Sequence, residues 1–380
     1  MMALLSYLPA AIALAGCGYH LAATVALRRF VKAEPDAVSQ SLPPVTVLKP
    51  LCGGEPCLLG NLKSFARQDY PRFQIVFGVR EADDPALATV AALQGDHPEL
   101  DMAVVVDPSL HGSNNKVSNL INMMAAARHD VLVISDSDVA VEPDHLKRVV
   151  TTLQRPGVGI ATCLYTGRAS DTPWSHLLAM GMNHAFVPAA LVARALGRRD
   201  GCFGPTMALH RETLERMGGF AALADRLADD YDLGAAIRAR GLTIAVVPGL
   251  IDIAVHEPDL SSLFHHELRW ERTVALLAPL GHAATVMTQP LPFALLAALI
   301  SPGGWAVLAL AAAARLAVVR LQETAMALAP APLRLVLARE ALSFAVFVAA
   351  AAGRSVIWRG SRFRVHRDGT LSACMERQPR

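Results

Sequence analysis

Short apolar runs alternate with segments of helical pattern through the middle of the chain. The clearest run, residues 131–134, is β-branched and aliphatic and stops abruptly at Ser135-Asp136-Ser137-Asp138, which predicts a fully buried strand. The predicted strands are 45–48, 73–79, 102–106, 131–134, 158–165 and 243–247, and the predicted helices are 57–68, 85–93 and 117–127. Strands that alternate with helices predict an α/β fold with a mostly parallel sheet.

The N-terminal apolar pattern is different, because residues 4–27 carry no charge. This run of about 24 residues is long enough for a helix to cross a hydrocarbon core of about 30 Å. A signal peptide is the alternative, but no basic region precedes the run, which is also longer than a usual signal core. Arg28, Arg29 and Lys32 follow at once, and the positive-inside rule then places the N-terminus outside and the next domain in the cytoplasm.

The apolar pattern returns after about residue 284. Residues 284–319 are almost uncharged but contain the turn Pro302-Gly303-Gly304, which predicts two short spans. A third run, 341–353, has about 13 residues and fits an interfacial or re-entrant helix as well as a span. The arginine-rich tail should stay inside, so either this run does not cross alone or residues 326–337 pair with it. The predicted order is a transmembrane anchor, a linker, a cytoplasmic domain, transmembrane or interfacial helices and a basic cytoplasmic tail, at 1–30, 31–43, 44–282, 283–353 and 354–380.

Composition agrees with a membrane protein. Hydrophobic residues make up 53% of the chain and charged residues 18%, which is too apolar for an ordinary soluble enzyme. The formal net charge of +2 gives no basic footprint for nucleic acid. The six cysteines are scattered without two matched pairs, which argues against zinc, and we expect them to be reduced.

Two carboxylates follow the buried strand 131–134. The carboxyl ends of strands are where open α/β sheets bind ligands. Asp136 and Asp138 are two residues apart and can reach one divalent ion, and such hard oxygen ligands suit Mg²⁺ or Mn²⁺ shared with a phosphate. The alternative is a polar turn after a strand, an ordinary use of Asp and Ser.

Two other strand ends also carry polar residues. Asp84 follows the second strand, where its carboxylate can accept hydrogen bonds from a base or a ribose hydroxyl, or can cap a helix. Lys116 lies in G-S-N-N-K-V-S-N, which follows the third strand and opens a helix. Backbone N–H groups at a helix start, together with a lysine, make a phosphate site. Alternatively, Asn114 or Asn115 simply caps the helix.

Three further segments have both a structural and a chemical interpretation. Asp230 lies in A-D-D-Y-D-L, where three acids at a helix start agree with the helix dipole, but a general base must also be a carboxylate. Arg269 and Trp270 lie just before the membrane segments, where they can hold a diphosphate or sit in the membrane interface, and both can be true. A lone histidine such as His184 is more often structural than catalytic.

The order of these motifs is specific. D-D-P, N-K-x-x-N-L, D-S-D, G-x-x-M-A-L, D-D-Y and R-W follow one another over about residues 44–275. This order resembles the membrane glycosyltransferases of the ceramide glucosyltransferase family, which include bacterial hopanoid-biosynthesis enzymes. The resemblance implies a GT-A nucleotide-sugar fold, a UDP-sugar donor, a divalent cation and inversion at the anomeric carbon.

The resemblance also implies site residues. The family's first three signature aspartates fall on Asp84, Asp136 and Asp230. Asp84 is expected to bind the donor, Asp136 to bind both the metal and the donor, and Asp230 to act in catalysis. Asp138 is a second metal ligand that not all members share. Lys116 falls in the N-K-x-x-N-L motif and is expected on the donor side.

The last motif of the family starts with Gln or Arg, followed after two intervening residues by Arg-Trp. In this chain His266 stands at the first position, which is a departure, whereas Arg269 and Trp270 match and are expected to bind the donor. His184 looks like a histidine that lies near the acceptor in the ceramide enzymes. We place His184 and His266 on the acceptor side.

The sequence therefore predicts an inverting hexosyltransferase in a bacterial inner membrane, with its catalytic domain in the cytoplasm. Its expected partners are a UDP-sugar, a membrane lipid acceptor and the bilayer, with no nucleic acid. Glucose to a ceramide-type sphingolipid and N-acetylglucosamine to a hopanoid polyol are alternative reactions. A processive polysaccharide synthase usually has Q-x-x-R-W and more spans, and a transporter or membrane scaffold with a degenerate nucleotide domain does not explain the intact carboxylates.

Overall fold

A computed structural model of the chain describes residues 6–34, 37–39, 41–353, 355–358, 361–365 and 370–373. The chain forms two compact units that interleave along the sequence. We call them the sheet unit, Ala33–Arg168 with Arg198–Ala254, and the helical unit, Met1–Lys32 with Ala169–Gly197 and Val255–Arg380. Residues 169–197 and 255–282, which lie within the predicted range 44–282, group with the helical unit.

The sheet unit contains an eight-stranded sheet in the order β3-β2-β1-β4-β7-β6-β8-β5. The strands are β1 Val45–Pro50, β2 Phe73–Val79, β3 Asp101–Val106, β4 Val131–Ser135, β5 Val139–Ala140, β6 Val158–Ala169, β7 Thr206–His210 and β8 Thr243–Val255. The first four in spatial order, β3, β2, β1 and β4, pair in parallel. The other half differs, because β7 is antiparallel to both β4 and β6, and β5 is antiparallel to β8.

The prediction of a mostly parallel sheet is therefore correct for one half and wrong for the other. The parallel half consists of strands joined by crossover helices, as the alternating pattern indicates. The other half depends on β7, which lies in G-C-F-G-P-T-M-A-L-H, and on the two-residue β5. Neither segment has a distinctive apolar pattern, so the sequence analysis predicted neither strand.

Helices cover both faces of the sheet, as in other α/β folds. The helices of this unit are α3 Leu58–Ala66, α4 Ala86–Asp96, α5 Asn115–Met123, α6 His145–Leu153, α9 Arg211–Arg216, η2 Phe220–Leu223 and α10 Asp229–Ala239. One core joins Val117 and Leu120 of α5 and Leu233 of α10 to Val76 of β2 and Ile134 of β4. This packing fixes the starts of α5 and α10 relative to the sheet.

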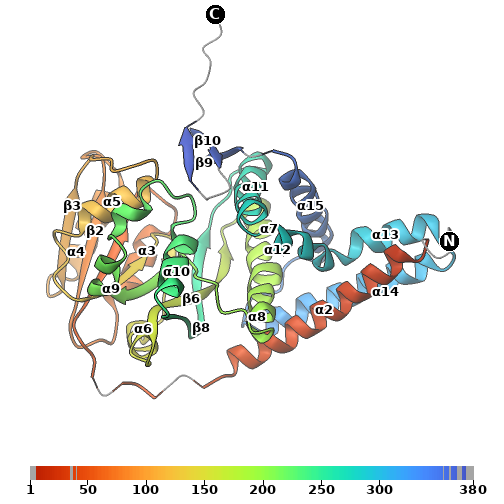
Figure 1. The fold of residues 1–380 in the computed structure, drawn as a ribbon, viewed down its shortest axis with the longest axis horizontal. Coiled ribbons are helices and arrows are strands. Elements are labelled where there is room, and N and C mark those ends of the chain that lie inside the picture. Colours follow the sequence, from red (N-terminus) through yellow and green to blue (C-terminus); the bar gives the residue numbers. More distant parts are fainter. Residues whose placement is uncertain are drawn as a thin grey trace, which may run out of the picture. The chain divides into compact units, whose positions relative to one another are not determined.

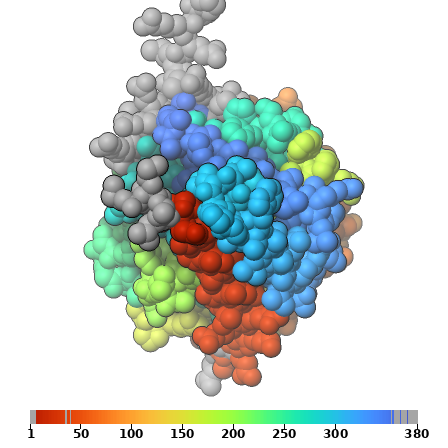
Figure 2. All heavy atoms as spheres, turned by 90° about the vertical axis from the view of Figure 1, so that its right-hand side faces the viewer, coloured from red at the N-terminus to blue at the C-terminus, as the bar shows by residue number. Residues whose placement is uncertain are grey.

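The helical unit is built from long apolar helices. They are α2 Leu8–Val31, α7 Pro173–Gly181, η1 Met182–Phe186, α8 Val187–Ala195, α11 Leu260–Leu277, α12 Pro279–Ala284, η3 Thr285–Thr288, α13 Pro290–Ile300, α14 Gly304–Ala325 and α15 Leu333–Ala351. Helices α2, α13 and α14 lie side by side (Figure 1), and the space-filling view shows them adjoining on one face (Figure 2). Ala13, Ala294 and Ala311 form part of their shared apolar core. At the turn between α13 and α14, a side chain on Gly304 would collide with the backbone of Ala297.

Three helical segments among the described residues are long and apolar enough to cross a membrane. They are Leu8–Val31, Pro173–Ala195 and Gly304–Ala325, and the bent pair Pro279–Thr288 and Pro290–Ile300 makes a fourth if it counts as one span. The span at 173–195 was not predicted, because the sequence analysis took the whole of 44–282 as soluble. The predicted pair of spans at 284–319 corresponds to α13 and α14.

The last apolar run is longer than predicted. It belongs to α15, a helix of 19 residues that includes Arg334, Arg339 and Glu340 and is not among the candidate spans. Of the segment 326–337, which was expected to pair with this run, residues 333–337 belong to α15 itself. After α15 come β9 Ser355–Trp358, β10 Ser361–Val365 and β11 Leu371–Ala373, an antiparallel sheet that was not predicted. The tail arginines Arg354, Arg359 and Arg367 lie outside the described residues.

Candidate active site

Backbone contacts hold the turn after β4 in place. The Lys49 ammonium donates to the backbone oxygen of Asp136 over 2.6 Å, and Asn61 Nδ2 donates to the backbone oxygen of Ser137 over 3.2 Å. The Asp136 N–H donates to the backbone oxygen of Pro205 over 3.1 Å. The turn is thus tied to β1, α3 and the segment before β7. These contacts fix both carboxylates of D-S-D at the carboxyl end of β4.

The carboxylate of Asp138 is poorly compensated. Its Oδ1 is buried and has no hydrogen-bond partner in the described part of the chain. Burial raises the pKa of Asp138 to about 7, the charges of Asp136 and Glu55 add to the increase, and those of Lys49 and Lys116 oppose it. Hard divalent cations prefer carboxylate oxygens as ligands. A buried carboxylate oxygen that receives no hydrogen bond and lies beside a second carboxylate offers such ligands.

The side chains at this site could supply only some of the ligands that such a cation needs. Within the described ranges, no three His, Cys, Asp or Glu side chains are grouped so that they could hold a metal ion together. Asp136 and Asp138 therefore supply two carboxylates. The other oxygen ligands have to come from water or from a substrate phosphate, as is usual for Mg²⁺.

Lys116 lies beside these carboxylates at the start of α5. Its Nζ is 2.6 Å from Asp136 Oδ1 and 3.9 Å from Asp229 Oδ2. Burial lowers the pKa of Lys116, but the charges of Asp136 and Asp229 raise it more, so the net shift is upward and the ammonium stays charged. Asn114 caps α5, since its Oδ1 accepts from the Val117 N–H over 3.1 Å. The predicted helix cap and the charged Lys116 are therefore both present.

Asp230 lies in the first turn of α10. Its Oδ2 accepts from the Gly204 N–H over 2.9 Å and its Oδ1 from the Tyr231 N–H over 2.8 Å. A Cβ atom at Gly204 would lie 3.1 Å from Asp230 Oδ2, so glycine allows this close approach. Burial raises the pKa of Asp230 to about 6, the charge of Asp229 adds to this, and Lys116 and the two N–H groups oppose it. A carboxylate of raised basicity suits a general base.

Asp84 makes contacts that stabilise a turn. Both of its carboxylate oxygens lie 3.0 Å from the Gly53 nitrogen, and Oδ1 also accepts from the Ala86 N–H over 2.8 Å. The side chain thus joins the loop after β1 to the start of α4. These contacts agree with the helix-start interpretation of Asp84, and its role toward a nucleotide stays a prediction.

Lys49 is a site residue that the sequence analysis missed. It is fully buried, and its Nζ lies 3.9 Å from the centre of the Phe65 ring. Burial lowers the pKa of Lys49 to about 7, and the charges of Asp138, Asp136 and Glu55 oppose the shift. The available signal was a lysine directly after the apolar residues Val45–Leu48, where the predicted strand ended and the real strand continues.

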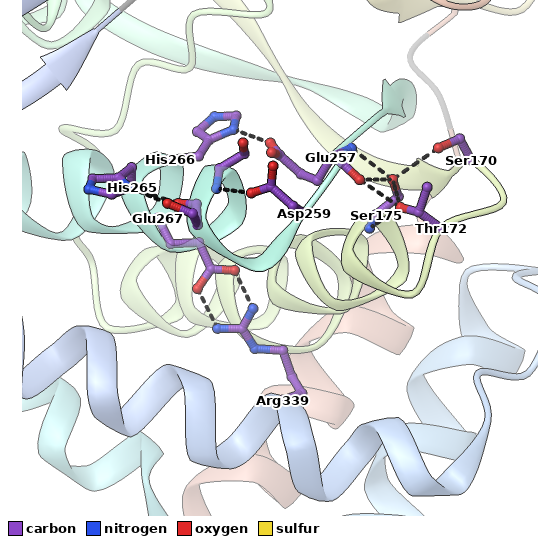
Figure 3. Close-up of polar contacts among 11 residues, drawn as sticks. Ser170, Thr172, Ser175, Glu257, Asp259, His265, His266, Glu267 and Arg339 are labelled. Atoms are coloured by element: carbon purple, nitrogen blue, oxygen red, sulfur yellow. Dashed lines mark hydrogen bonds and ion pairs between the residues drawn. The ribbon is translucent and has the colours of Figure 1, made fainter. Parts of the chain in front are cut away.

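The R-W segment lies on α11 of the helical unit. His266, Arg269 and Trp270 are spaced three and four residues apart and share one helix face. The ring centres of His266 and Trp270 are 4.4 Å apart, and the Arg269 guanidinium carbon is 6.0 Å from the Trp270 ring centre. His266 Nδ1 lies 2.6 Å from Glu257 Oε1 (Figure 3).

His184 has a different environment. It lies in η1, a short π-helical turn, with 2% of its surface exposed, and its Nε2 is 3.6 Å from Glu323 Oε1. The predicted residues therefore fall into separate groups. Asp136, Asp138, Lys116 and Asp230 gather in the sheet unit, and His266, Arg269 and Trp270 gather on α11. Asp84 contacts the loop after β1 and the start of α4, and His184 lies in η1.

Comparison with known proteins decides the class. The sequence profile described as Glycosyl transferase family 21 matches residues 8–371. The chain belongs to glycosyl transferase family 21. The predicted resemblance to ceramide glucosyltransferases is thereby confirmed, as is the assignment to the glycosyltransferases.

Relatives of this family 21 chain include two curated ceramide glucosyltransferases. Ceramide glucosyltransferase 1 of Caenorhabditis elegans is 29% identical over 219 residues, which are 57% of this chain and 46% of the relative. The ceramide glucosyltransferase of Komagataella phaffii is 32% identical over 133 residues, 34% of this chain and 26% of the relative. The chain thus spans about half the length of the first relative and less of the second.

A solved structure shares the fold. It is the mannosyltransferase PcManGT from Pyrobaculum calidifontis, in complex with GDP-Man and Mn²⁺, with a TM-score of 0.52 and 24% identity. The match covers 91% of the family 21 chain and 99% of the mannosyltransferase. The predicted GT-A fold is confirmed.

Proposed function

We propose that this chain is an inverting glycosyltransferase that moves a hexose from a UDP-sugar to a hydroxyl of a ceramide-type membrane lipid. The observation that carries the proposal is the carboxylate pair Asp136 and Asp138 at the end of β4, with a buried oxygen that has no donor among the described residues and with Lys116 alongside. The names of the two curated relatives support glucose and ceramide as substrates.

Asp136 and Asp138 would hold a Mg²⁺ or Mn²⁺ ion. The related mannosyltransferase was solved with Mn²⁺, which supports a divalent cation. Such an ion, when bound, neutralises negative charge on the diphosphate leaving group. Lys116 supplies a fixed positive charge at the start of α5, where helix N–H groups also favour phosphate.

Asp230 is the proposed general base. The acceptor oxygen forms a bond to the anomeric carbon while the bond from that carbon to the phosphate oxygen breaks, and its electron pair leaves with UDP. The hydroxyl proton passes to a carboxylate oxygen of Asp230. This single displacement inverts the anomeric carbon and needs no protein nucleophile. The raised pKa of Asp230, about 6, matches a base that works near neutral pH.

The other candidate residues keep the roles that the family resemblance implies. Arg269 and Trp270 contribute positive charge and shielding from water to the diphosphate, and Asp84 positions the nucleotide. His184 and His266 are placed on the acceptor side. The apolar helices carry the enzyme in a bacterial inner membrane, with the catalytic part facing the cytoplasm as the basic flank of α2 indicates. Tags at residue 200 and at the C-terminus should both be inaccessible from outside intact cells.

A transfer assay tests the function. Purified protein in ceramide-containing vesicles should release UDP from UDP-glucose and form a product heavier than the lipid by one hexose, as seen by mass spectrometry. Asp138→Asn should remove this activity while the protein remains folded. Transfer of N-acetylglucosamine to a hopanoid instead would overturn the proposed substrates, and no transfer from any UDP-sugar to any lipid would overturn the function.

A further inference from the structure

Glu257 is a carboxylate held rigidly just before α11. Its backbone N–H donates to Ser175 Oγ over 2.8 Å, and its backbone oxygen accepts from Thr172 Oγ1 over 2.7 Å. Two residues later, Asp259 caps α11 by accepting from the Ser262 N–H over 2.8 Å (Figure 3). The Glu257 side chain is only 8% exposed. The carboxylate therefore has one well-defined place beside the first turns of α11.

The partner of this carboxylate is His266. The 2.6 Å contact joins Glu257 Oε1 to Nδ1 of the imidazole. An ionised carboxylate only accepts hydrogen bonds, so Nδ1 carries the hydrogen. In a neutral ring Nε2 then has a free lone pair. The His266 side chain is 31% exposed, and its Nε2 has no hydrogen-bond partner in the part of the chain that the structure describes.

The helix that carries His266 is also fixed. Glu267, the next residue, forms a buried double contact with the guanidinium of Arg339 on α15, one arm of which joins Oε2 and Nη2 over 2.6 Å. Trp270 meets the His266 ring edge to face. The imidazole thus sits between an anchored carboxylate and an anchored aromatic ring.

We propose that Glu257 is a positioning residue. It holds His266 with the hydrogen on Nδ1, so that Nε2 accepts a hydrogen bond from a substrate hydroxyl beside Trp270. This proposal rests on the proposed function, because the hydroxyl belongs to the donor sugar or to the lipid head group. The resemblance places Gln or Arg at this position in relatives. An amide oxygen of Gln accepts a hydrogen bond without any tautomer partner, whereas an imidazole needs the carboxylate to define which nitrogen accepts.

A spectroscopic experiment tests the tautomer without any substrate. Protein with ¹⁵N-labelled histidine is measured at pH 8, and the His266 signals are assigned by their loss in His266→Gln. The wild-type spectrum should show an unprotonated Nε2, and Glu257→Leu should shift the signals toward a mixture of tautomers. A protonated Nε2 in the wild type, or the same tautomer in Glu257→Leu, would overturn the proposal.

A double-mutant cycle tests the function of the pair. Glu257→Leu should lower kcat/KM by about 10- to 100-fold, as is typical when the partner of a functional histidine is removed. In the His266→Gln background the same change should cost less than about threefold, because Glu257 acts only through the imidazole. Equal losses in both backgrounds would show a merely structural role. A rise confined to the KM of the UDP-sugar assigns the hydroxyl to the donor, and one confined to the lipid KM assigns it to the acceptor.

The same helix offers a matched control. Glu271 Oε1 lies 2.7 Å from Nδ1 of His282, and this imidazole stacks on Phe347. Glu271→Leu removes an equivalent carboxylate–imidazole contact, but it should leave the His266 signals unchanged, and its kinetic effect should be the same in the wild-type and His266→Gln backgrounds. If the wild type transfers no sugar at all, the proposed function fails while the tautomer result still decides the role of Glu257.

Discussion

Buried charges occur in both units of the chain, and their surroundings differ. In the sheet unit, the charges of Asp136 and Asp138 repel each other, and Asp138 Oδ1 has no donor in the part of the chain that the structure describes. In the helical unit, all three guanidinium nitrogens of Arg339 have acceptors, from Glu267, from Ser343 Oγ and from the backbone oxygen of Leu177. A buried polar group that lacks a partner is costly.

This contrast separates two uses of the same residue types. A pair whose polar atoms all have partners, such as Glu267 and Arg339, is accounted for by its structural role of joining α11 to α15. Asp138 Oδ1, in contrast, has no donor among the described residues although the charges of Lys49 and Lys116 act on it, and a bound cation would supply the missing partner. Strongly perturbed carboxylates in such surroundings are typical of functional sites. Each prediction below removes one side of this comparison.

Metal removal should have the largest effect. Excess EDTA should abolish transfer, since the charge of the diphosphate would then face Asp136 and Asp138 directly. Adding Mn²⁺ or Mg²⁺ back should restore the rate. The measurement is UDP release from the UDP-sugar in lipid vesicles, with a parallel sample that receives EDTA already saturated with Mg²⁺. Full activity in excess EDTA would show that the unsatisfied oxygen of Asp138 has another purpose.

Asp230→Asn should have the next largest effect. The change keeps the shape of the side chain and removes the base, so kcat should fall by about 10² to 10⁴. The affinity for the UDP-sugar, measured by calorimetry, should change much less. Asp136→Asn should differ by weakening UDP and metal binding together. Asp96→Asn is the control, because this exposed aspartate only pairs with Lys63 on the surface.

If Asp230→Asn turns over at nearly the wild-type rate, the base is elsewhere. Asp229 is then the next residue to change, because its carboxylate lies 3.9 Å from Lys116. Asp232 lies in the same helical turn and follows it.

Breaking the satisfied pair should affect stability instead. Arg339→Leu leaves Glu267 buried without its partner and should cost about 3 to 5 kcal/mol in the free energy of unfolding. The double variant Glu267→Leu with Arg339→Leu should recover most of this loss. Unfolding in detergent, followed by circular dichroism, measures both. Arg216→Leu is the control, since its pair with Glu212 is exposed and should contribute less than about 1 kcal/mol.

Local pattern predicted the parallel half of the sheet, whereas the residues of the candidate site were chosen from local pattern together with the family resemblance. The run 73–79 matches β2, and D-S-D follows β4 as expected. Asp136, Lys116 and Asp230 come together because strand ends and helix starts meet at one edge of a sheet.

The missed features depend on contacts between distant segments. Lys49 has its site contact with Asp136, which is 87 positions away in the chain. Glu257 is held in place by a hydrogen bond to Ser175, which lies 82 positions earlier, in α7. The candidate span at 173–195 was not predicted because it lies between strands of the sheet, where a moderately apolar helix has the same pattern as a buried core helix.

The smallest predicted effect is a pH dependence of kcat that comes from Asp230 and not from paired charges such as Glu267 and Arg339. Burial disfavours the ionised form and raises the pKa of Asp230 to about 6. A base must be ionised to accept the proton, so kcat should decrease as the pH falls through about 6. Well below that value the decrease should approach tenfold per pH unit, which leaves about one-tenth of the plateau rate at pH 5.

The profile needs controls because other groups titrate in the same range. His266→Gln should keep the acidic decrease, since it leaves Asp230 intact. Asp230→Asn should retain only its low residual rate with no decrease near pH 6. Circular dichroism at pH 5 excludes unfolding as the cause. An acidic decrease that persists in Asp230→Asn would assign the titration to another group and remove the support that the raised pKa gives to Asp230 as the base.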